Sequence, residues 1–236
     1  AEKKASNEIW QTEGGIHWFQ VQTEGPIFAP RKWHQVVVFR NKMWVIGGQL
    51  ERTTRQTHTA TDVWSSEDGI HWMQVADRTA MGRVEQHRAL VFDNQLWVFG
   101  GKLNLTSDEL SNEPPRAEKT PDLNTLWSSP NGLHWFKVSE DEKLFGSIEA
   151  KHPVVFNKKL WLFAVGKSIY SSQDGRQWQK ESTPFPLTPL ESKRMRIHQL
   201  NGELFLIGNL IWSSKDALAW KAVSDTLHIQ CQSNCV

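Results

Sequence analysis

Short apolar runs separated by turn residues recur along the whole chain, and helical periodicity is nearly absent. The run HQVVVF at 34–39 is followed by the pair RN and then by KMWVIGG at 42–48. Two β-branched or aromatic runs joined by an Asn-containing pair predict a β-hairpin. The same order returns as HRALVF-DN-QLWVFGG at 87–101, HPVVF-NK-KLWLFAVG at 152–166 and IHQL-NG-ELFLIG at 197–208.

A second hairpin pattern follows each of these first hairpins. Its clearest copy is DVWSSEDGIHWMQV at 62–75, in which a polar DG turn separates two runs and a tryptophan begins the last one. Each repeat therefore predicts four antiparallel strands, which can bury both faces of the sheet only by packing against neighbouring repeats around an axis. We predict an all-β fold, a β-propeller of four-stranded antiparallel blades. The other copies are EIWQTEGGIHWFQV at 8–21, TLWSSPNGLHWFKV at 125–138, SIYSSQDGRQWQKE at 168–181 and LIWSSKDALAWKAV at 210–223.

The two hairpin patterns resemble two related families. The first half, H-VVF-NK-WVIGG, is similar to the kelch repeat of bacterial galactose-oxidase-like propellers. The second half, WSSxDGxxW, resembles the Asp-box of sialidase-type propellers, Ser-x-Asp-x-Gly-x-x-Trp. This resemblance implies a capped turn that the tryptophan staples, and not a catalytic site. The Asp position itself is filled by Glu67, Pro130, Gln173 and Lys215, and the acid or amide stands one place later, at Asp68, Asn131, Asp174 and Asp216.

We expect residues 1–236 to form one propeller domain of five blades, the last closed by both termini. Such closure removes exposed sheet edges. A disulfide between Cys231 and Cys235 would pin the terminal hairpin, and the alternative is a pair of reduced thiols. An extracytoplasmic location (periplasmic, cell-surface or secreted) favours the bridge. The expected blades are about 31–75, 83–138, 149–181, 194–223, and 8–21 together with 225–236.

Two long loops, 49–61 and 102–124, are predicted on the same face of the propeller. Long loops without internal structure are usually functional, and the alternative is a solvated insertion. The first loop contains Arg52 and Arg55. We consider these two loops the candidate recognition elements.

A histidine begins the first strand of each repeat, which is the innermost strand in a propeller. Converging imidazoles with nearby cations could bind an anion or a carboxylate. The alternative is that each histidine contacts the neighbouring blade and recurs because the blade recurs, and we expect no metal site. The histidines are His34, His87, His152 and His198, and the basic residues before them include Arg31, Arg83 and Arg196.

Composition excludes several functional classes. The net charge is only +1, which argues against nucleic-acid binding, and no apolar stretch is long enough to span a membrane. The single tyrosine, Tyr170, replaces a tryptophan of the repeat, so the tyrosines that galactose oxidases and sialidases use are absent.

We therefore predict a non-enzymatic binding or scaffold propeller without a cofactor, a monomer that recognises a protein or carbohydrate partner through loops 49–61 and 102–124. The alternative is a kelch-type sugar (sialic acid-like) mutarotase, or a small-anion-binding protein at the channel mouth. In the mutarotase, Glu85 and Glu149 would be the candidates for general acid–base catalysis.

Overall fold

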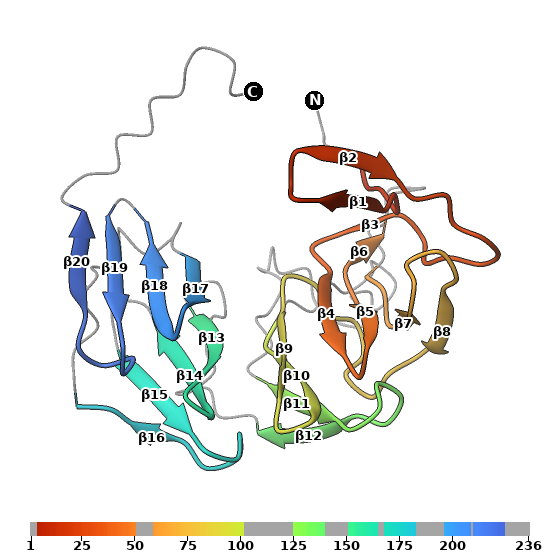
Figure 1. Cartoon of the computed structure of the whole chain (residues 1–236). Helices are drawn as coiled ribbons and strands as arrows, with labels where there is room; N and C mark the ends of the chain where they lie inside the picture. The colour runs from red at the N-terminus through yellow and green to blue at the C-terminus, as the bar shows by residue number, and fades with distance from the viewer. Residues whose placement is uncertain are drawn as a thin grey trace, which may run out of the picture. The chain divides into compact units, whose positions relative to one another are not determined.

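The computed structural model describes residues 4–50, 59–101, 125–139, 151–164, 168–182, 196–208 and 210–224. Within these ranges the chain forms strands and turns, without a helix. It divides into two compact units, residues 1–148 and residues 149–236, and each unit is described by itself (Figure 1).

The first unit contains two four-stranded antiparallel sheets. The first sheet has the order β4 (Gln35–Phe39), β5 (Lys42–Ile46), β7 (Val63–Ser66), β8 (Met73–Ala76). The second sheet has the order β9 (Arg88–Phe92), β10 (Gln95–Phe99), β11 (Leu126–Ser129), β12 (Phe136–Ser139). Two smaller pairs accompany them: β1 (Trp10–Glu13) with β2 (His17–Gln20), and β3 (Arg31–Lys32) with β6 (Gln49–Leu50).

The second unit contains two further sheets of the same kind. The third sheet consists of β13 (Lys151–Phe156), β14 (Lys159–Ala164), β15 (Ser168–Ser172) and β16 (Gln179–Lys180). The fourth consists of β17 (Arg196–Leu200), β18 (Glu203–Ile207), β19 (Ile211–Ser214) and β20 (Lys221–Ser224). In all four sheets, strands that follow one another along the chain pair antiparallel, except that β6, which lies between β5 and β7 in the chain, pairs with β3 instead. The predicted four-stranded antiparallel sheets are confirmed.

The first hairpin of each sheet closes through a two-residue turn in which both residues have positive φ. Arg40 and Asn41, with φ of 50° and 56°, join β4 to β5. Two left-handed residues give the type I′ geometry that matches the twist of the flanking strands. In the first three sheets a tryptophan then closes this hairpin, as when the Trp44 indole N–H donates to the Phe39 carbonyl at 2.9 Å; the fourth sheet has Phe205 at this position. Equivalent bonds join Trp97 to Phe92 at 2.9 Å and Trp161 to Phe156 at 3.1 Å.

The second hairpin of each sheet turns through a capped loop. In the first sheet the Ser66 hydroxyl accepts the Gly69 N–H at 2.8 Å, and Asp68 accepts the N–H groups of Ile70 and His71 at 2.8 and 2.9 Å. The Trp72 indole donates to the Gly69 carbonyl at 3.0 Å. The cap is therefore the residue one place after the position expected from the family pattern. The same capping bonds occur at Asn131, Asp174 and Asp216.

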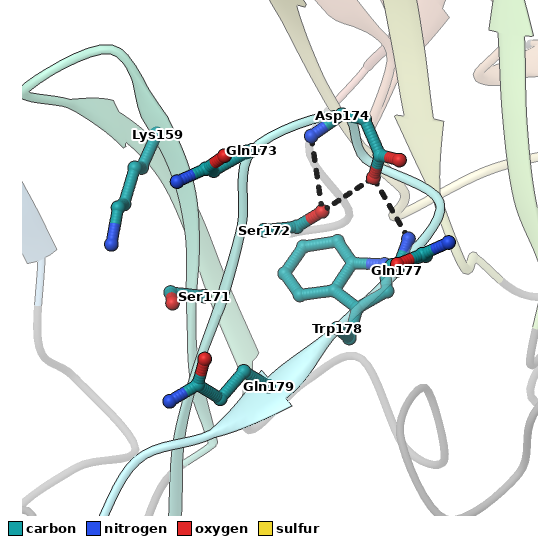
Figure 2. A pocket seen from close by; sticks show the side chains of 8 residues that line it. All are labelled: Lys159, Ser171, Ser172, Gln173, Asp174, Gln177, Trp178 and Gln179. Atoms are coloured by element: carbon teal, nitrogen blue, oxygen red, sulfur yellow. Dashed lines mark hydrogen bonds between the residues drawn. The ribbon is translucent and has the colours of Figure 1, made fainter.

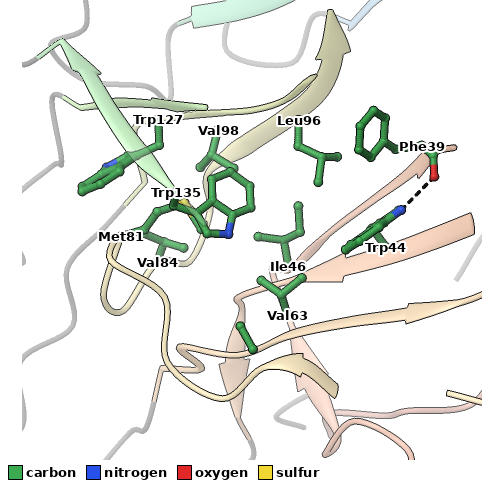
Figure 3. Close-up of a cluster of buried hydrophobic side chains, with 11 residues drawn as sticks. Phe39, Trp44, Ile46, Val63, Met81, Val84, Leu96, Val98, Trp127 and Trp135 are labelled. Atoms are coloured by element: carbon green, nitrogen blue, oxygen red, sulfur yellow. Dashed lines mark hydrogen bonds between the residues drawn. The ribbon is translucent and has the colours of Figure 1, made fainter. Parts of the chain in front are cut away.

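The core of the first unit lies between its two four-stranded sheets (Figure 3). Trp44 and Ile46 of the first sheet pack with Leu96 and Trp135 of the second. The turn of the second sheet also contacts Trp44, because a Cβ built at Gly132 would collide with its indole ring. Glycine is therefore required at this turn both for its φ of 75° and for the close approach.

The second unit repeats this arrangement with a change at the turn. Ala217, with a φ of 69°, stands where the second sheet has Gly132. It is fully buried in one cluster with Trp161 of the third sheet and Leu206 of the fourth. The alanine methyl group thus packs in the core. This packing is opposed by the strain of a left-handed backbone, which L-residues disfavour.

The β1–β2 hairpin leaves exposed the tryptophans that the first and second sheets bury. Trp10 and Trp18 are 50% and 57% exposed, whereas Trp64 and Trp72 are 8% and 6% exposed. Residues 225–236, with Cys231 and Cys235, lie outside the described residues. The fifth blade closed by both termini, the single domain and the disulfide therefore stay predictions.

Candidate binding surface at the start of the first strands

The candidate site lies where the first strands of the first and second sheets begin. We call it the strand-one entrance and define it as residues 31–35, 47–49 and 84–87. Two backbone hydrogen bonds hold its parts together, from Gly48 N–H to the Val84 carbonyl at 2.9 Å and from Gln86 N–H to the Trp33 carbonyl at 3.0 Å. The site is therefore shared by two neighbouring sheets of the first unit.

The glycine pair that ends β5 explains why a histidine recurs at this place. A Cβ at Gly48 would lie 2.7 Å from the His34 Cβ, and a Cβ at Gly47 would lie 3.1 Å from the His87 Cε1. Each histidine thus packs on a glycine of its own sheet or of the preceding sheet. In the first unit the recurrence of His34 and His87 has a packing cause.

His87 is not accessible to a ligand. Its side chain has no exposed surface, and burial, followed by the nearby charges of His34 and Arg88, lowers its pKa to about 3. The Ile46 carbonyl beside the ring favours the charged form only weakly, without forming a well-aligned hydrogen bond in the described structure. His87 is therefore neutral at pH 7.

His34 differs from His87 in being only half-buried. Burial and the Arg31 charge both lower its pKa, so its imidazole is neutral at neutral pH. Its buried Nδ1 meets no acceptor or donor among the described residues.

Arg31 binds the protein itself. Its guanidinium donates two hydrogen bonds to Asp62, at 2.7 and 3.0 Å, and further bonds at 3.0 Å to the carbonyls of Gly47 and Ala29. A bidentate arginine–carboxylate pair of this kind fixes geometry as well as charge. Arg31 therefore anchors the chain on both sides of loop 49–61.

Glu85 is buried, with 3% of its surface exposed. It accepts a hydrogen bond from the Thr59 hydroxyl at 3.0 Å and a longer one from the Gln49 amide at 3.5 Å. These two donors stand at the two ends of loop 49–61. The carboxylate of the second sheet thus fastens the base of a loop that the first sheet carries.

Of the other predicted site residues, Arg83 directly precedes the 84–87 segment of the entrance, and His152, His198 and Arg196 belong to the second unit. In the second unit His152 is buried and His198 is exposed. Arg83 is half-buried and Arg196 exposed, and His152, Arg83 and Arg196 each have a partner within the protein. Outside the described residues lie Arg52, Arg55, Glu149, Cys231 and Cys235.

Sequence reasoning missed Trp33, which directly precedes His34. Its φ is 59°, its side chain is 48% exposed, and the Lys32 Nζ lies 4.7 Å from the centroid of its ring. Gln86 holds the equivalent position in the next sheet with a φ of 57°. The available signal was that only this repeat places a tryptophan before its first-strand histidine.

A pocket of about 390 Å³ lies at the turn between β15 and β16 (Figure 2). Ser171 and Ser172 are neighbours in β15, so their hydroxyls point to opposite faces of the sheet. Ser172 also accepts the Gly175 N–H at 2.8 Å, and the Trp178 indole donates to the Gly175 carbonyl at 3.1 Å. Ser172 and Asp174 of this pocket therefore serve its turn, and Ser171 donates to Glu181 at 2.6 Å.

The described residues also bear on metal binding. They contain no group of three or more His, Cys, Asp or Glu side chains placed to hold a metal ion. The described part of the chain also has no long apolar helix of the kind that crosses a bilayer. The strand-one entrance offers to solvent an indole, an ammonium group and a neutral imidazole, beside the half-buried side chains of Gln35 and Gln86.

Comparison with known families adds one result. A family model described as "DUF6242 beta propeller domain" matches residues 67–190 and again residues 129–232. The two matches begin 62 residues apart, which is about one repeat, so the same pattern fits the chain in two registers. The predicted β-propeller architecture is thereby confirmed, and the number of blades stays a prediction. No curated protein matches the chain.

Proposed function

The chain belongs to the DUF6242 beta propeller domain family, and from this premise we propose that it is a non-enzymatic binding propeller. The face that carries loops 49–61 and 102–124, beside the strand-one entrance, would recognise a protein or glycan partner. The observation that carries this proposal is the strained and exposed Trp33 at the base of the first loop.

Trp33 is placed to take part in recognition because β3 pairs with β6. Lys32 is opposite Gln49 in this pair and Arg31 is opposite Leu50, so Trp33 follows the strand that holds the start of loop 49–61. Tryptophan is enriched among the residues that dominate binding energies. A contact residue next to a loop on a rigid sheet is a common arrangement for binding proteins.

The base of the loop is fixed, which supports binding with little loss of conformational entropy. Arg31 binds Gly47 before the loop and Asp62 after it. Glu85 accepts hydrogen bonds from Gln49 and Thr59, again one residue at each end of the loop. Preorganised contact residues raise affinity because less freedom is lost on association.

The mutarotase alternative has less support. Glu85, its proposed acid–base residue, is buried and hydrogen-bonded to Thr59 and Gln49. The test follows by NMR the rate at which the anomers of sialic acid and of neutral sugars interconvert. We expect this rate to be the same with the protein as in buffer alone. An accelerated exchange that Glu85→Gln abolishes would favour the enzyme instead.

Binding is tested by presenting the labelled full chain to a glycan array and to a protein array. We expect at least one spot that the wild type and Trp10→Ala bind equally and that Trp33→Gly does not bind. Trp10 is the control because its exposed fraction, 50%, matches the 48% of Trp33. The melting temperature of Trp10→Ala is measured first, to show that this variant is folded. If Trp33→Gly retains every interaction, the proposed face is wrong.

We also propose that the protein is a monomer in an extracytoplasmic compartment, with kelch-type first hairpins and Asp-box-type second hairpins. The pair Cys231 and Cys235 motivates the location, because disulfides persist in oxidising compartments. Mass spectrometry after alkylation without reductant should find both cysteines unmodified. Two alkylated thiols would remove this support.

A further inference from the structure

We propose that the strand-one entrance is a subsite for an acidic sugar: a pyranose ring stacks on the Trp33 indole while its carboxylate pairs with the Lys32 ammonium. This inference rests on the proposed function, which allows a protein or a glycan partner, and it specifies a glycan. It names the class of ligand, the two contacting residues and the role of the charge.

The first step is that neither the backbone conformation of Trp33 nor the exposure of its side chain stabilises the folded state. A φ of 59° is a backbone outlier for a bulky side chain, and 48% of this large apolar side chain is exposed. Strained residues persist where the surrounding structure imposes them. Here the Trp33 carbonyl accepts the Gln86 N–H at 3.0 Å, which holds the strained backbone in place. Because Gln86 has the same backbone at the equivalent position, the exposed indole, rather than the φ, is what points to function.

The second step is that the indole is free to accept a ligand. Its N–H donates to no acceptor in the described part of the chain, and the Lys32 ammonium lies over its ring, 4.7 Å from the centroid. A flat aromatic side chain offers a large contact area with only two rotatable bonds. The C–H face of a pyranose matches that shape, and hydroxyl groups around its edge remain in water.

The third step is the charge around the indole. Within the strand-one entrance Glu85 is the single acidic residue, and it is buried and turned to Thr59. The Arg31 charge is paired with Asp62, and His34 is half-buried. Among the described charged residues of the strand-one entrance, Lys32 is therefore the one that a ligand on Trp33 meets, and a carboxylate is the group that complements it.

The test compares acidic glycans with neutral forms of the same glycans. An array carries uronic-acid and sialic-acid oligosaccharides, each beside its methyl-esterified form, which removes the charge and keeps the ring. We expect the wild type to bind at least one acidic glycan, with at least tenfold weaker binding to its ester, because a charge-assisted hydrogen bond is lost. Lys32→Met should weaken binding to the acid similarly and leave binding to the ester unchanged.

Variants at Trp33 separate recognition from folding. Trp33→Gly removes the indole and relieves the positive φ, so it should melt no lower than the wild type and yet lose binding at least tenfold. Trp33→Phe keeps an aromatic face and should retain part of the affinity, and Trp10→Ala should bind like the wild type. A Trp33→Gly variant that binds normally, or that melts well below the wild type, would overturn the proposal.

The remaining outcomes distinguish this inference from the proposed function. If acid and ester bind equally and both depend on Trp33, the acidic-sugar assignment fails and the binding face stands. The same holds if the wild type binds only protein spots that Trp33→Gly loses. If no glycan and no protein depends on Trp33, both proposals fail.

Discussion

At the scale of single residues, the positions that hold the two sheets of the first unit together are those where a side chain would be in the way. Gly132 lies against the Trp44 ring, and Gly47 lies against Val84 and His87. The sequence shows these glycines as turn residues or strand ends. Their second role, close contact between sheets, appears only when distant segments are packed.

Gly132→Ala should destabilise the protein by about 2–5 kcal/mol, because overpacking against Trp44 adds to the left-handed backbone strain. The control is Gly82→Ala, where φ is 70° and no atom lies within 4 Å of the added Cβ. That variant should lose only about 1–2 kcal/mol. Urea unfolding measures both, and equal losses would mean that the contact with Trp44 carries no energetic weight.

His87 predicts acid sensitivity of the fold. Its pKa falls from 6.5 to about 3 on burial, so between these pH values the unfolded chain binds a proton that the folded chain does not. Stability therefore falls as the pH falls through this window, by about 3 kcal/mol at pH 4.

His87→Leu, of similar size, should remove this share of the pH dependence, seen as a flatter plot of the urea midpoint from pH 7 to pH 4. The same substitution at the exposed His198 serves as the control. Parallel plots for the wild type and His87→Leu would show that His87 titrates normally in the folded protein.

At the scale of strands and turns, the sequence predicted most of what the structure contains. The hairpins are local: the pair Arg40-Asn41 specifies its own turn, and the alternation around it specifies the strands. The site could not be predicted in the same way. His87 packs against Gly47, which lies 40 residues earlier in the chain. The positive φ of Trp33 could not be predicted either, because tryptophan is not a residue type that favours it.

The capped turn gives a prediction about which residue does the capping. Asp174 accepts two backbone N–H groups at 2.7 and 2.8 Å, and these bonds, first that from Gln177, lower its pKa. Asp174→Ala should cost about 0.5–2 kcal/mol, the typical value of a lost cap. This stabilisation is present at neutral pH and is lost as the pH falls through the lowered pKa.

Gln173, at the position that the family pattern gives to aspartate, is the matched control. Gln173→Ala should change stability by less than about 0.5 kcal/mol, as for an ordinary exposed site. Thermal and urea unfolding at pH 7 compare the two variants. A larger loss at Gln173 than at Asp174 would contradict the displaced cap.

At the scale of the whole molecule, the open question is the fifth blade. Trp10 and Trp18 in the β1–β2 hairpin are exposed, where the equivalent Trp64 and Trp72 are buried. Residues 225–236 contain the pattern of a first strand, and we propose that they complete this blade. Propellers remove exposed strand edges by such closure.

Deleting residues 225–236 should lower the melting temperature by several degrees and increase the quenching of tryptophan fluorescence by iodide. The full-length variant Cys231→Ser removes only the proposed disulfide and keeps the strand. It therefore separates the contribution of the disulfide to the melting temperature from that of the strand. An unchanged melting temperature and unchanged quenching in the deletion variant would exclude the closed blade.

Recognition at the strand-one entrance is tested most directly by thermal shift of the wild type, Trp33→Gly and Trp10→Ala against sugars, sialic acids, organic anions and divalent metals. A ligand that binds only the folded chain raises its melting temperature. We predict that an acidic sugar raises the melting temperature of the wild type and of Trp10→Ala and leaves that of Trp33→Gly unchanged. A ligand that shifts all three proteins equally would place recognition elsewhere on the propeller and contradict the role of Trp33.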